Sequence, residues 1–478
     1  MRNSKQSHDF QSIQRSEFKK EKFWKGCIKN GVPSFQVDRA LLSDFLEKMG
    51  YRTYSSFGNV QVVQLLNGIV FIKTPQDIFN DLLIIIKEQK NDLLRSCFIE
   101  QGENLLLVKK AILGSLPLIE LDRYRDTRKT VHLFYQNGII KITKSKRKAF
   151  SYKKFGKRKH YIFSEQIIRR NIKLIDGKNS DIKKFISLVT NDNSHFNSVC
   201  SAIGYLVSSY KNPSLVKAII ITDILSQVKN DAYGRSGKGI LVKALSKIIN
   251  VTEYNGKVTD LTNDKFVFQN VNLNTTLIVL QDVTKGFLFE SLFSTLTDNM
   301  SIERKHRPKI NMPFTDSPKI ALTTNYTIPQ ETDSFKDRKH LVTLNNFFNA
   351  KNKPEKYFKH LLFEWDDDEW NRFDNFIIEC VQLFLKKGLI TYESEDLKLK
   401  KLINQTSRDF VYLMNADYDR LNDYFGLKEL AQMLEVDAEE PRTRSKIVSQ
   451  WVDLYAIFKG YKVERRKSAG VTKMCFKI

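Results

Sequence analysis

A glycine-rich segment at residues 234–239 has the residue types of a phosphate-binding loop. It follows a β-branched apolar run at 216–222, and apolar residues at helical spacing follow it as far as Ile248. In the order strand, loop, helix, small residues let backbone N–H groups close on phosphates, the helix N-terminus favours the anion, and a lysine reaches the β and γ oxygens. We therefore expect a nucleotide's phosphates to contact Gly234, Arg235, Ser236, Gly237, Lys238 and Gly239.

The segment departs from the strict phosphate-loop pattern at two positions. Ala232 stands at the first glycine position, and Gly239 replaces the Ser or Thr whose hydroxyl would ligate Mg²⁺. Gly-Lys pairs also arise by chance in a chain with 78 Lys and Arg residues. Because phosphate loops are built at the surface, we expect Lys238→Ala to abolish ATP binding and to leave the fold intact.

Two later segments place polar side chains at the ends of apolar runs. Residues 276–282 indicate a buried strand that ends in Gln281 and Asp282, and residues 319–325 indicate another that ends in Asn325. A carboxylate there suits Mg²⁺ or its water, and an amide can bind both the γ-phosphate and the attacking water. Each run alone is typical of a core strand, but the ordered set with Lys238 is much less expected by chance.

Residues 134–390 resemble a known family. The most specific stretches are FYQNGIIKIT, SAIGYLVSSYKN, FLFESLFSTLTDNMSIERKH, SPKIALTTNY and WDDDEWNRFDNFIIECVQLFLKKGLI. They are similar to the superfamily 3 helicase module of phage and plasmid primase-helicases, which is related to the poxvirus-type primase-helicase. The resemblance implies an AAA+ type ATPase whose subunits close into a ring around DNA.

The resemblance also implies a role for individual residues. Lys238 falls on the phosphate-loop lysine, Asp282 on the metal-site acid and Asn325 on the sensor asparagine. Lys305 falls in the basic loop that enters the ring channel, and Arg338 on the arginine supplied to the neighbouring subunit's nucleotide. A guanidinium suits the spread charge of a transferring γ-phosphoryl group; the alternative is that Arg338 pairs with a surface acid.

Three positions depart from the family's pattern. Gln281 precedes Asp282 where similar proteins usually have two adjacent carboxylates, Asp337 precedes Arg338 where they often have two arginines, and Gly239 lacks a hydroxyl. Gln281 is a catalytic candidate because glutamine can orient water, but it is not a strong base. Slow turnover, or nucleotide binding with little hydrolysis, is therefore an open alternative.

The charge of the chain predicts a polyanionic partner. Its 78 Lys and Arg and 54 Asp and Glu give a net charge of +24. Such a charge favours nucleic acid as the partner, and the alternative is a basic protein without such a partner. Residues 141–159 interleave ten Lys or Arg with Phe150, Tyr152 and Phe155, which is typical of a single-strand track or of a solvated charged hairpin. A second basic loop, at 304–309, is expected to contact phosphates without reading bases, or to be a solvated cluster. The expected DNA contacts are Lys153, Lys154, Lys157 and Arg158, and Arg304, Lys305, Arg307 and Lys309.

The C-terminal end has the pattern of a separate module. Residues 427–434 and 444–458 indicate two helices, and residues 462–478 indicate a basic hairpin. This order resembles a winged helix-turn-helix, with Arg465, Arg466 and Lys467 near the wing tip as DNA contacts. The alternative is a helical lid with a terminal hairpin.

A chain of 478 residues suits about three domains and can bury a sizeable core. We predict an α/β fold class: an AAA+ type P-loop ATPase core, an N-terminal α/β or α+β domain and a C-terminal helical or winged-helix-like module. The expected parts are a mobile segment at 1–22, an N-terminal domain at 23–133 with β-rich runs such as 105–108, a basic hairpin and helical connector at 134–205, the ATPase core at 206–345, a helical subdomain at 346–400 and the winged-helix-like module at 401–478.

Composition disfavours several other classes. Five separated cysteines without a CxxC pair predict reduced thiols rather than disulfides or a zinc site. The aliphatic runs are too short for a membrane span and the start is too charged for a signal peptide, so we expect no membrane association and a cytoplasmic location in a bacterial host. Residues 1–133 show no primase metal site, and the acidic run at 366–369 is expected as the exposed start of a helix.

These patterns and the resemblance predict an ATP-dependent DNA helicase of a phage or plasmid replication system. It would be a ring translocase on single-stranded DNA that uses ATP and Mg²⁺. Its expected partners are single-stranded and forked duplex DNA, further copies of the chain in a hexameric ring, and a separate primase or polymerase. The alternative is a hydrolysis-weak P-loop scaffold for origin binding or replisome loading.

Overall fold

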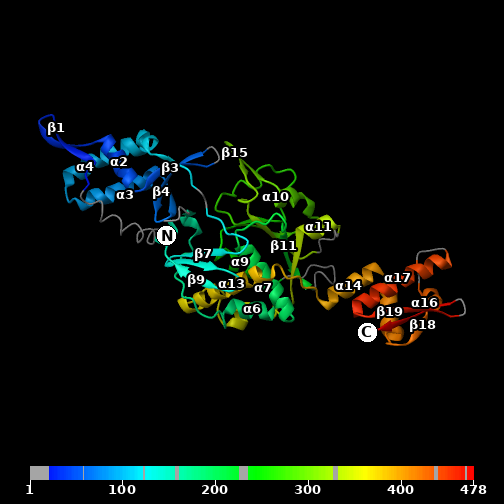
Figure 1. Cartoon of the computed structure of the whole chain (residues 1–478). Coiled ribbons are helices and arrows are strands. Elements are labelled where there is room, and N and C mark those ends of the chain that lie inside the picture. Colours follow the sequence, from blue (N-terminus) through cyan, green and yellow to red (C-terminus); the bar gives the residue numbers. More distant parts are fainter. Residues whose placement is uncertain are drawn as a thin grey trace.

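The computed structural model describes residues 21–56, 59–121, 124–156, 161–224, 235–326, 332–434, 436, 440–468 and 471–478. Its helices and strands form three parts that follow one another in sequence order along the molecule (Figure 1). Parallel sheets, antiparallel sheets and helices together make the fold mixed α/β. Among the expected features, Gly234, Lys157, Arg158 and nearly all of the N-terminal segment lie outside the described residues.

The N-terminal part is a sheet with helices packed on it. A hairpin of β1 (Trp24–Lys29) and β2 (Val32–Val37) precedes α2 (Arg39–Lys48). The sheet has the order β10-β5-β4-β3-β6 and consists of β3 (Tyr51–Ser56), β4 (Asn59–Leu66), β5 (Ile69–Lys73), β6 (Leu118–Ile119) and β10 (Ile162–Phe163). The helices α3 (Pro75–Glu88) and α4 (Asp92–Gly102) share a core with α2 and β3.

One expected strand of this part is wrong. The run at 105–108 lies in the π-helical turn η2 (Glu103–Val108), which continues α4 and precedes η3 (Ala111–Ser115). Leu105 and Leu106 are buried in the N-terminal core. A short apolar run does not distinguish a strand from a buried helical segment, which explains the error.

An antiparallel meander links the N-terminal part to the central part. It consists of β7 (Val131–Tyr135), β8 (Gly138–Ile142) and β9 (Arg147–Phe150), and it leads into the short helix α5 (Tyr152–Gly156). Tyr152 and Phe155 are 5% and 2% exposed and pack in an apolar cluster, whereas Lys153 and Lys154 are exposed. A single-strand track could not use these two rings for stacking, because burial removes them from solvent and leaves only the lysines of α5 outside.

A five-stranded parallel sheet forms the central part, with the order β12-β13-β16-β11-β17. Its strands are β11 (Ala218–Asp223), β12 (Val251–Asn255), β13 (Leu277–Val283), β16 (Lys319–Thr324) and β17 (Lys339–Leu344). Every pairing is parallel, so the carboxyl ends of all five strands lie at the same edge. Buried strands with covered faces are expected to be continuous apolar runs, as β11 and β16 are.

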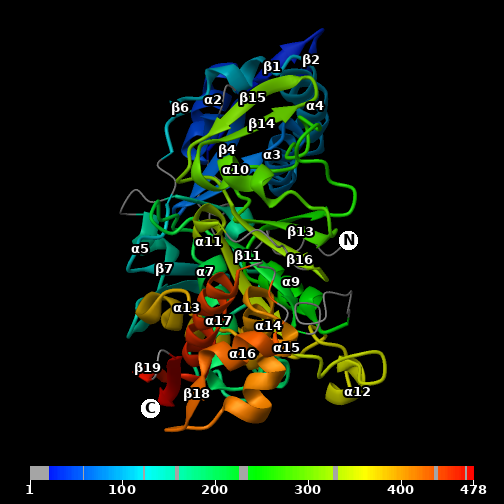
Figure 2. The same ribbon diagram turned by 90° about the vertical axis from the view of Figure 1, so that its right-hand side faces the viewer.

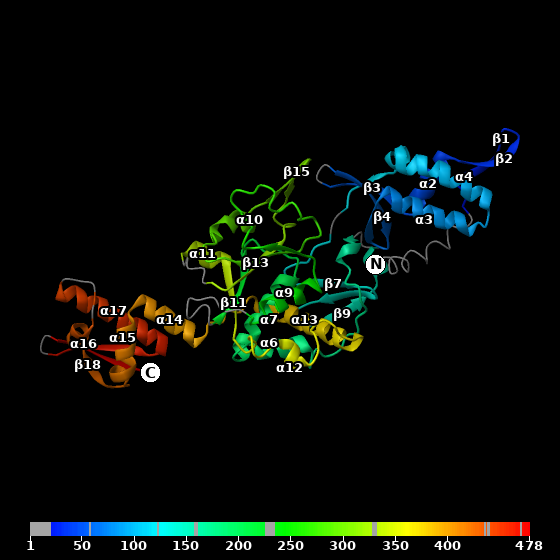
Figure 3. The ribbon, with the colours of Figure 1, turned by 180° about the vertical axis from the view of Figure 1, so that it is seen from behind.

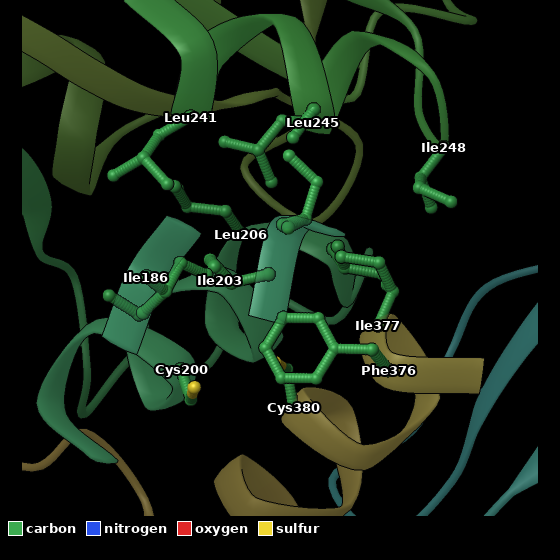
Figure 4. Packing of buried hydrophobic residues seen from close by; sticks show 14 of the residues in the cluster. Ile186, Cys200, Ile203, Leu206, Leu241, Leu245, Ile248, Phe376, Ile377 and Cys380 are labelled. Carbon is green, nitrogen blue, oxygen red and sulfur yellow. The ribbon is translucent and has the colours of Figure 1, made fainter. Parts of the chain in front are cut away.

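Helices cover one face of the central sheet. They are α6 (Asp181–Leu188), α7 (Asn193–Val207), α9 (Lys238–Ser246) and α13 (Asp367–Lys387). Figure 4 shows Ile203 and Leu206 of α7 in the same packed cluster as Leu241 and Leu245 of α9. The acidic run does start α13, with Asp366 as the N-cap, but Glu369 is buried and accepts a bond from the Asp181 backbone, so the helix start is only partly exposed.

Shorter elements cover the opposite face. They are η5 (Phe289–Leu292), α10 (Phe293–Thr297), α11 (Asp333–Arg338) and a hairpin of β14 (Met300–Arg304) and β15 (Arg307–Met312). The short helix α12 (Pro354–Phe358) follows β17. The sheet is thus the middle of three layers. The described elements on its two faces do not cover the carboxyl ends of its strands, where ligands of such sheets bind.

The C-terminal part has a core of its own. Its helices are α14 (Glu395–Gln405), α15 (Arg408–Leu413), η6 (Met414–Tyr418), α16 (Leu427–Met433) and α17 (Pro441–Lys459). The strands β18 (Tyr424–Gly426), β19 (Lys462–Ser468) and β20 (Val471–Lys477) form an antiparallel sheet in the order β18-β20-β19. Figures 2 and 3 show α16 and α17 beside this sheet. The two helices and the hairpin occur where the sequence predicts them.

No helix in the described ranges is both long and apolar enough to cross a bilayer. All five cysteines are free thiols, and burial next to Cys200 raises the pKa of Cys380.

Candidate nucleotide-binding site

The parallel sheet brings the predicted site residues to one edge. Asp223, Asp282 and Asn325 lie at the carboxyl ends of β11, β13 and β16. Because β16 runs between the other two strands, Asn325 lies between the strand that precedes the phosphate loop and the strand that carries Asp282. The helix α9 begins at this edge with Lys238. Ligands of open parallel sheets bind outside this edge.

Two oxygens hold the Lys238 ammonium. Its Nζ lies 2.6 Å from Asp223 Oδ2 and donates to Asn325 Oδ1 at 2.7 Å. The Lys238 and Asp223 side chains are only 8% and 4% exposed. Removing one partner of a buried ion pair leaves an uncompensated charge and costs about 3–5 kcal/mol. The burial of this pair argues against the expectation that Lys238→Ala leaves the fold intact, and we now expect the substitution to destabilise the central part as well.

Asp223 was not among the predicted site residues. The signal was present, because Asp223 is the first charged residue after the apolar run at 216–222, just as Asp282 ends the run at 276–282. In a parallel sheet, the first polar residue after a buried strand lies at the ligand-binding edge.

Asp282 and Gln281 lie at an irregularity at the end of β13. The register of β13 on β16 shifts between Leu280 and Val283, and Asp282 has a φ of 55°. This turn leaves the Asp282 side chain exposed, and its backbone N–H donates to Thr323 Oγ1 at 2.8 Å. Aspartate is among the residues other than glycine that adopt this left-handed conformation most readily.

The Gln281 amide is bonded on both sides. Its Nε2 donates to Glu253 Oε2 at 2.7 Å, and its Oε1 accepts from Thr323 Oγ1 at 3.2 Å. Glu253 and Thr323 were also missed, since nothing in their local sequence singles them out. Because both the nitrogen and the oxygen of its amide are hydrogen-bonded, Gln281 links β12, β13 and β16. It thereby orients Thr323 beside Asp282.

The described part of the loop, residues 235–239, has the backbone of a tight anion cradle. Arg235 and Gly237 have φ values of 71° and 100°. A Cβ at Gly237 would collide with the ring of Phe185, so only glycine fits there. Ser236 is 1% exposed, and its Oγ has no hydrogen-bond partner among the described residues. A buried hydroxyl without a partner is costly, and an anion in the cradle would satisfy it.

A cavity of about 600 Å³ joins these groups. The polar lining at the sheet edge comprises Arg235, Lys238, Gln281, Asp282, Thr323 and Asn325, and Lys243 and Glu355 line the cavity further out. This volume lies within the range of small-ligand sites. No cluster of three or more metal-ligating side chains occurs in the described chain. A Mg²⁺ ion would therefore use Asp282 together with phosphate and water oxygens, which is its usual mode with nucleotides.

Arg338 lies at the other end of the sheet. It is the last residue of α11, next to Lys339, which pairs with Ala218 at the amino end of β11. Its guanidinium donates to Ser334 O and Oγ and lies over the Phe293 ring, 4.6 Å from the centroid. Arg338 does not line the cavity. Its side chain therefore lies away from the cavity of its own chain.

The basic residues at 304–309 form a hairpin tip rather than a loop. Arg304 and Arg307 pair at the ends of β14 and β15, so Lys305 and His306 make the turn. The Arg304 guanidinium donates to Val271 O at 2.9 Å, whereas Lys305 and Lys309 are exposed. Arg304 is thus held against the backbone, whereas Lys305 and Lys309 extend into solvent, with Lys309 Nζ 3.7 Å from Glu303 Oε1.

The basic residues of the C-terminal hairpin lie on the edge strand β19. Arg465 is paired with Asp453 of α17, and Arg466 with Glu464. Lys467 is exposed nearer the turn. Part of each guanidinium is therefore engaged with an acidic side chain, while both arginines stay exposed.

No protein-family model and no curated protein matches the sequence. Among solved structures, the apo A form of the NrS-1 C-terminal region is similar, at 11% identity and a TM-score of 0.43, over 91% of this chain and 98% of that chain. A second apo structure of that region is 12% identical with a TM-score of 0.43, over 92% and 99%. A JCV helicase bound to a substituted acetamide is 16% identical with a TM-score of 0.24, over 50% and 66%. TM-scores below 0.5 do not establish a shared fold.

Proposed function

We propose that this chain is an ATP-dependent DNA helicase that acts as a ring on single-stranded DNA. The observation that carries the proposal is the Lys238 ammonium, held between Asp223 and Asn325 at a cavity that Asp282 also lines. Lysine, carboxylate and amide at the carboxyl edge of a parallel sheet are the groups that phosphoryl transfer requires.

Each group has a role in this proposal. Residues 235–239 hold the nucleotide's phosphates, Lys238 contacts the β and γ oxygens, and Asp282 holds Mg²⁺. Mg²⁺ supplies charge neutralisation at the phosphates. Asn325 orients the attacking water, and Gln281 positions Thr323 and the Asp282 backbone.

The exposed cations are the proposed DNA contacts. Lys305 and Lys309 on the β14–β15 hairpin and Lys153 and Lys154 on α5 contact phosphates, and the C-terminal part, as a winged-helix module, adds Lys467. Such contacts are independent of base sequence, so binding to single strands should weaken with salt, with a log-log slope of about −0.7 per phosphate neutralised.

Arg338 is proposed to act on the neighbouring subunit's nucleotide in a hexameric ring. Its position at the amino end of the sheet, away from its own cavity, supports a role across an interface. A head-to-tail interface that closes on itself makes a ring. The proposal that this protein belongs to a phage or plasmid replication system rests on the sequence resemblance.

A second candidate is a nucleotide-binding scaffold with little hydrolysis. Two observations favour this candidate. The amide nitrogen and oxygen of Gln281 are both hydrogen-bonded to other strands of the sheet, and Gly239 has no hydroxyl to offer to Mg²⁺. Origin binding or replisome loading would then use the nucleotide to control assembly rather than translocation.

Steady-state phosphate release with and without single-stranded DNA tests both candidates. A helicase should hydrolyse ATP faster when DNA is present, and Lys238→Ala should abolish that activity. ATP binding without DNA-stimulated hydrolysis favours the scaffold. A wild-type protein that neither binds nor hydrolyses ATP contradicts both candidates.

A further inference from the structure

The cavity has an apolar end that the phosphate chemistry does not use. Its lining there comes from the segment after β17 and comprises Pro354, Leu361, Leu362 and Phe363, with Glu355 and the Lys243 side chain of α9. Leu361 is 53% exposed. The Lys243 Nζ lies over the Phe363 ring, 5.3 Å from its centroid.

The helix α9 connects the two ends of the cavity. Lys238 is its first residue and Lys243 lies five residues further on, so the backbones of the two lysines are about 7.5 Å apart along the helix axis. Both lysines line the cavity. A ligand with phosphates at Lys238 therefore extends towards Phe363.

The Phe363 ring packs among other aromatic rings at this end. Its ring centroid lies 4.9 Å from that of Trp365 and 6.4 Å from those of Trp370 and Phe373. Its backbone has a φ of 76°, which is a rare conformation for a bulky residue. Such strain persists only where the surrounding structure imposes it, and it is common at ligand clamps.

We propose that Phe363, with Leu361 and the Lys243 stem beside it, is the platform on which the nucleobase stacks. The inference rests on the proposed nucleotide site and adds its substrate class. Every base has a π-face, so stacking is tolerant of base identity. Among the described residues at this end, only Lys243 and Glu355 have charged or hydrogen-bonding side chains. The site therefore accepts nucleoside triphosphates with little selection among the bases.

Calorimetric titration with ATP, GTP, CTP and tripolyphosphate in the presence of Mg²⁺ tests this platform. Phe363→Leu keeps apolar volume in the aromatic cluster and removes the π-face. It should weaken all three nucleotides by roughly 5- to 100-fold and leave tripolyphosphate binding unchanged. Tyr357→Leu is the matched control, because Tyr357 is an exposed aromatic on the adjacent helix α12 that does not line the cavity.

The outcomes separate this inference from the function on which it rests. Nucleotide binding that survives Phe363→Leu, an equal loss of tripolyphosphate, or a wild-type preference above 100-fold for one base overturns the platform. Lys238→Ala should weaken nucleotides and tripolyphosphate alike. If that variant binds all four ligands as the wild type does, the phosphate site and the proposed function fail instead.

Discussion

Gly239→Ser adds the hydroxyl that the strict phosphate loop has and this chain lacks. Gly239 is the second residue of α9 and lines the cavity beside Lys238. A Cβ there meets no atom within 4 Å, so serine fits without displacing its neighbours. Serine is also the better helix former, and we expect a gain of about 0.5 kcal/mol in the free energy of unfolding, or about 1–2 °C in Tm.

The larger effect is expected on Mg²⁺-dependent nucleotide binding. A contact between a polar group and a charged one contributes about 1.5–3 kcal/mol, which corresponds to roughly 10- to 150-fold in affinity. The serine replaces a water ligand of the ion, so the lower end applies. We expect calorimetry to show about tenfold tighter ATP binding in Mg²⁺ and no change in EDTA. The rate of ATP hydrolysis should rise together with the ATP affinity if the hydroxyl missing at position 239 limits turnover.

The control is Gly286→Ser. A Cβ at Gly286 also meets open space, and the residue lies outside the cavity, so this variant should bind ATP as the wild type does. A folded Gly239→Ser protein whose ATP affinity is unchanged, or rises equally with and without Mg²⁺, would refute the reasoning, because the gain would not then come from the metal.

Three further predictions concern charged groups. Lys238→Ala should lower the free energy of unfolding of the central part by about 3–5 kcal/mol, and adding Asp223→Asn should recover most of it; strictly additive losses on urea denaturation contradict the buried pair. Mixing Arg338→Ala with Lys238→Ala subunits should restore part of the ATPase activity, since some interfaces then pair an intact loop with an intact arginine; an inert mixture of ring-forming variants contradicts a role across the interface. Burial, with a smaller contribution from Lys217, lowers the pKa of His340 to about 4. The unfolded histidine protonates near pH 6.5, so stability present above that pH should be lost as pH falls from about 6.5 to 4, and His340→Leu should flatten this loss; an equally steep loss would point to another group.

Local sequence determined the elements that frame the site. Strands buried on both faces must be continuous apolar runs, so the runs before Asp282 and Asn325 could be recognised without a structure. Glycines and a lysine between a strand and a helix marked the phosphate loop in the same way, because backbone freedom and helix polarity are properties of neighbouring residues. The carboxyl ends of parallel strands meet at one edge, which is why these distant motifs were expected to converge.

Only the tertiary structure decided which polar groups form ion pairs and hydrogen bonds and which side chains are exposed to solvent. The pairing of Lys238 with Asp223, the burial of Tyr152 and Phe155, and the approach of Phe363 to α9 join residues that no local period relates. The 105–108 run is helical although its apolar residues would also suit a strand, and it buries Leu105 and Leu106 in the N-terminal core. Local pattern sets the backbone's preferences, whereas burial and ion pairing depend on atoms brought together by the whole fold.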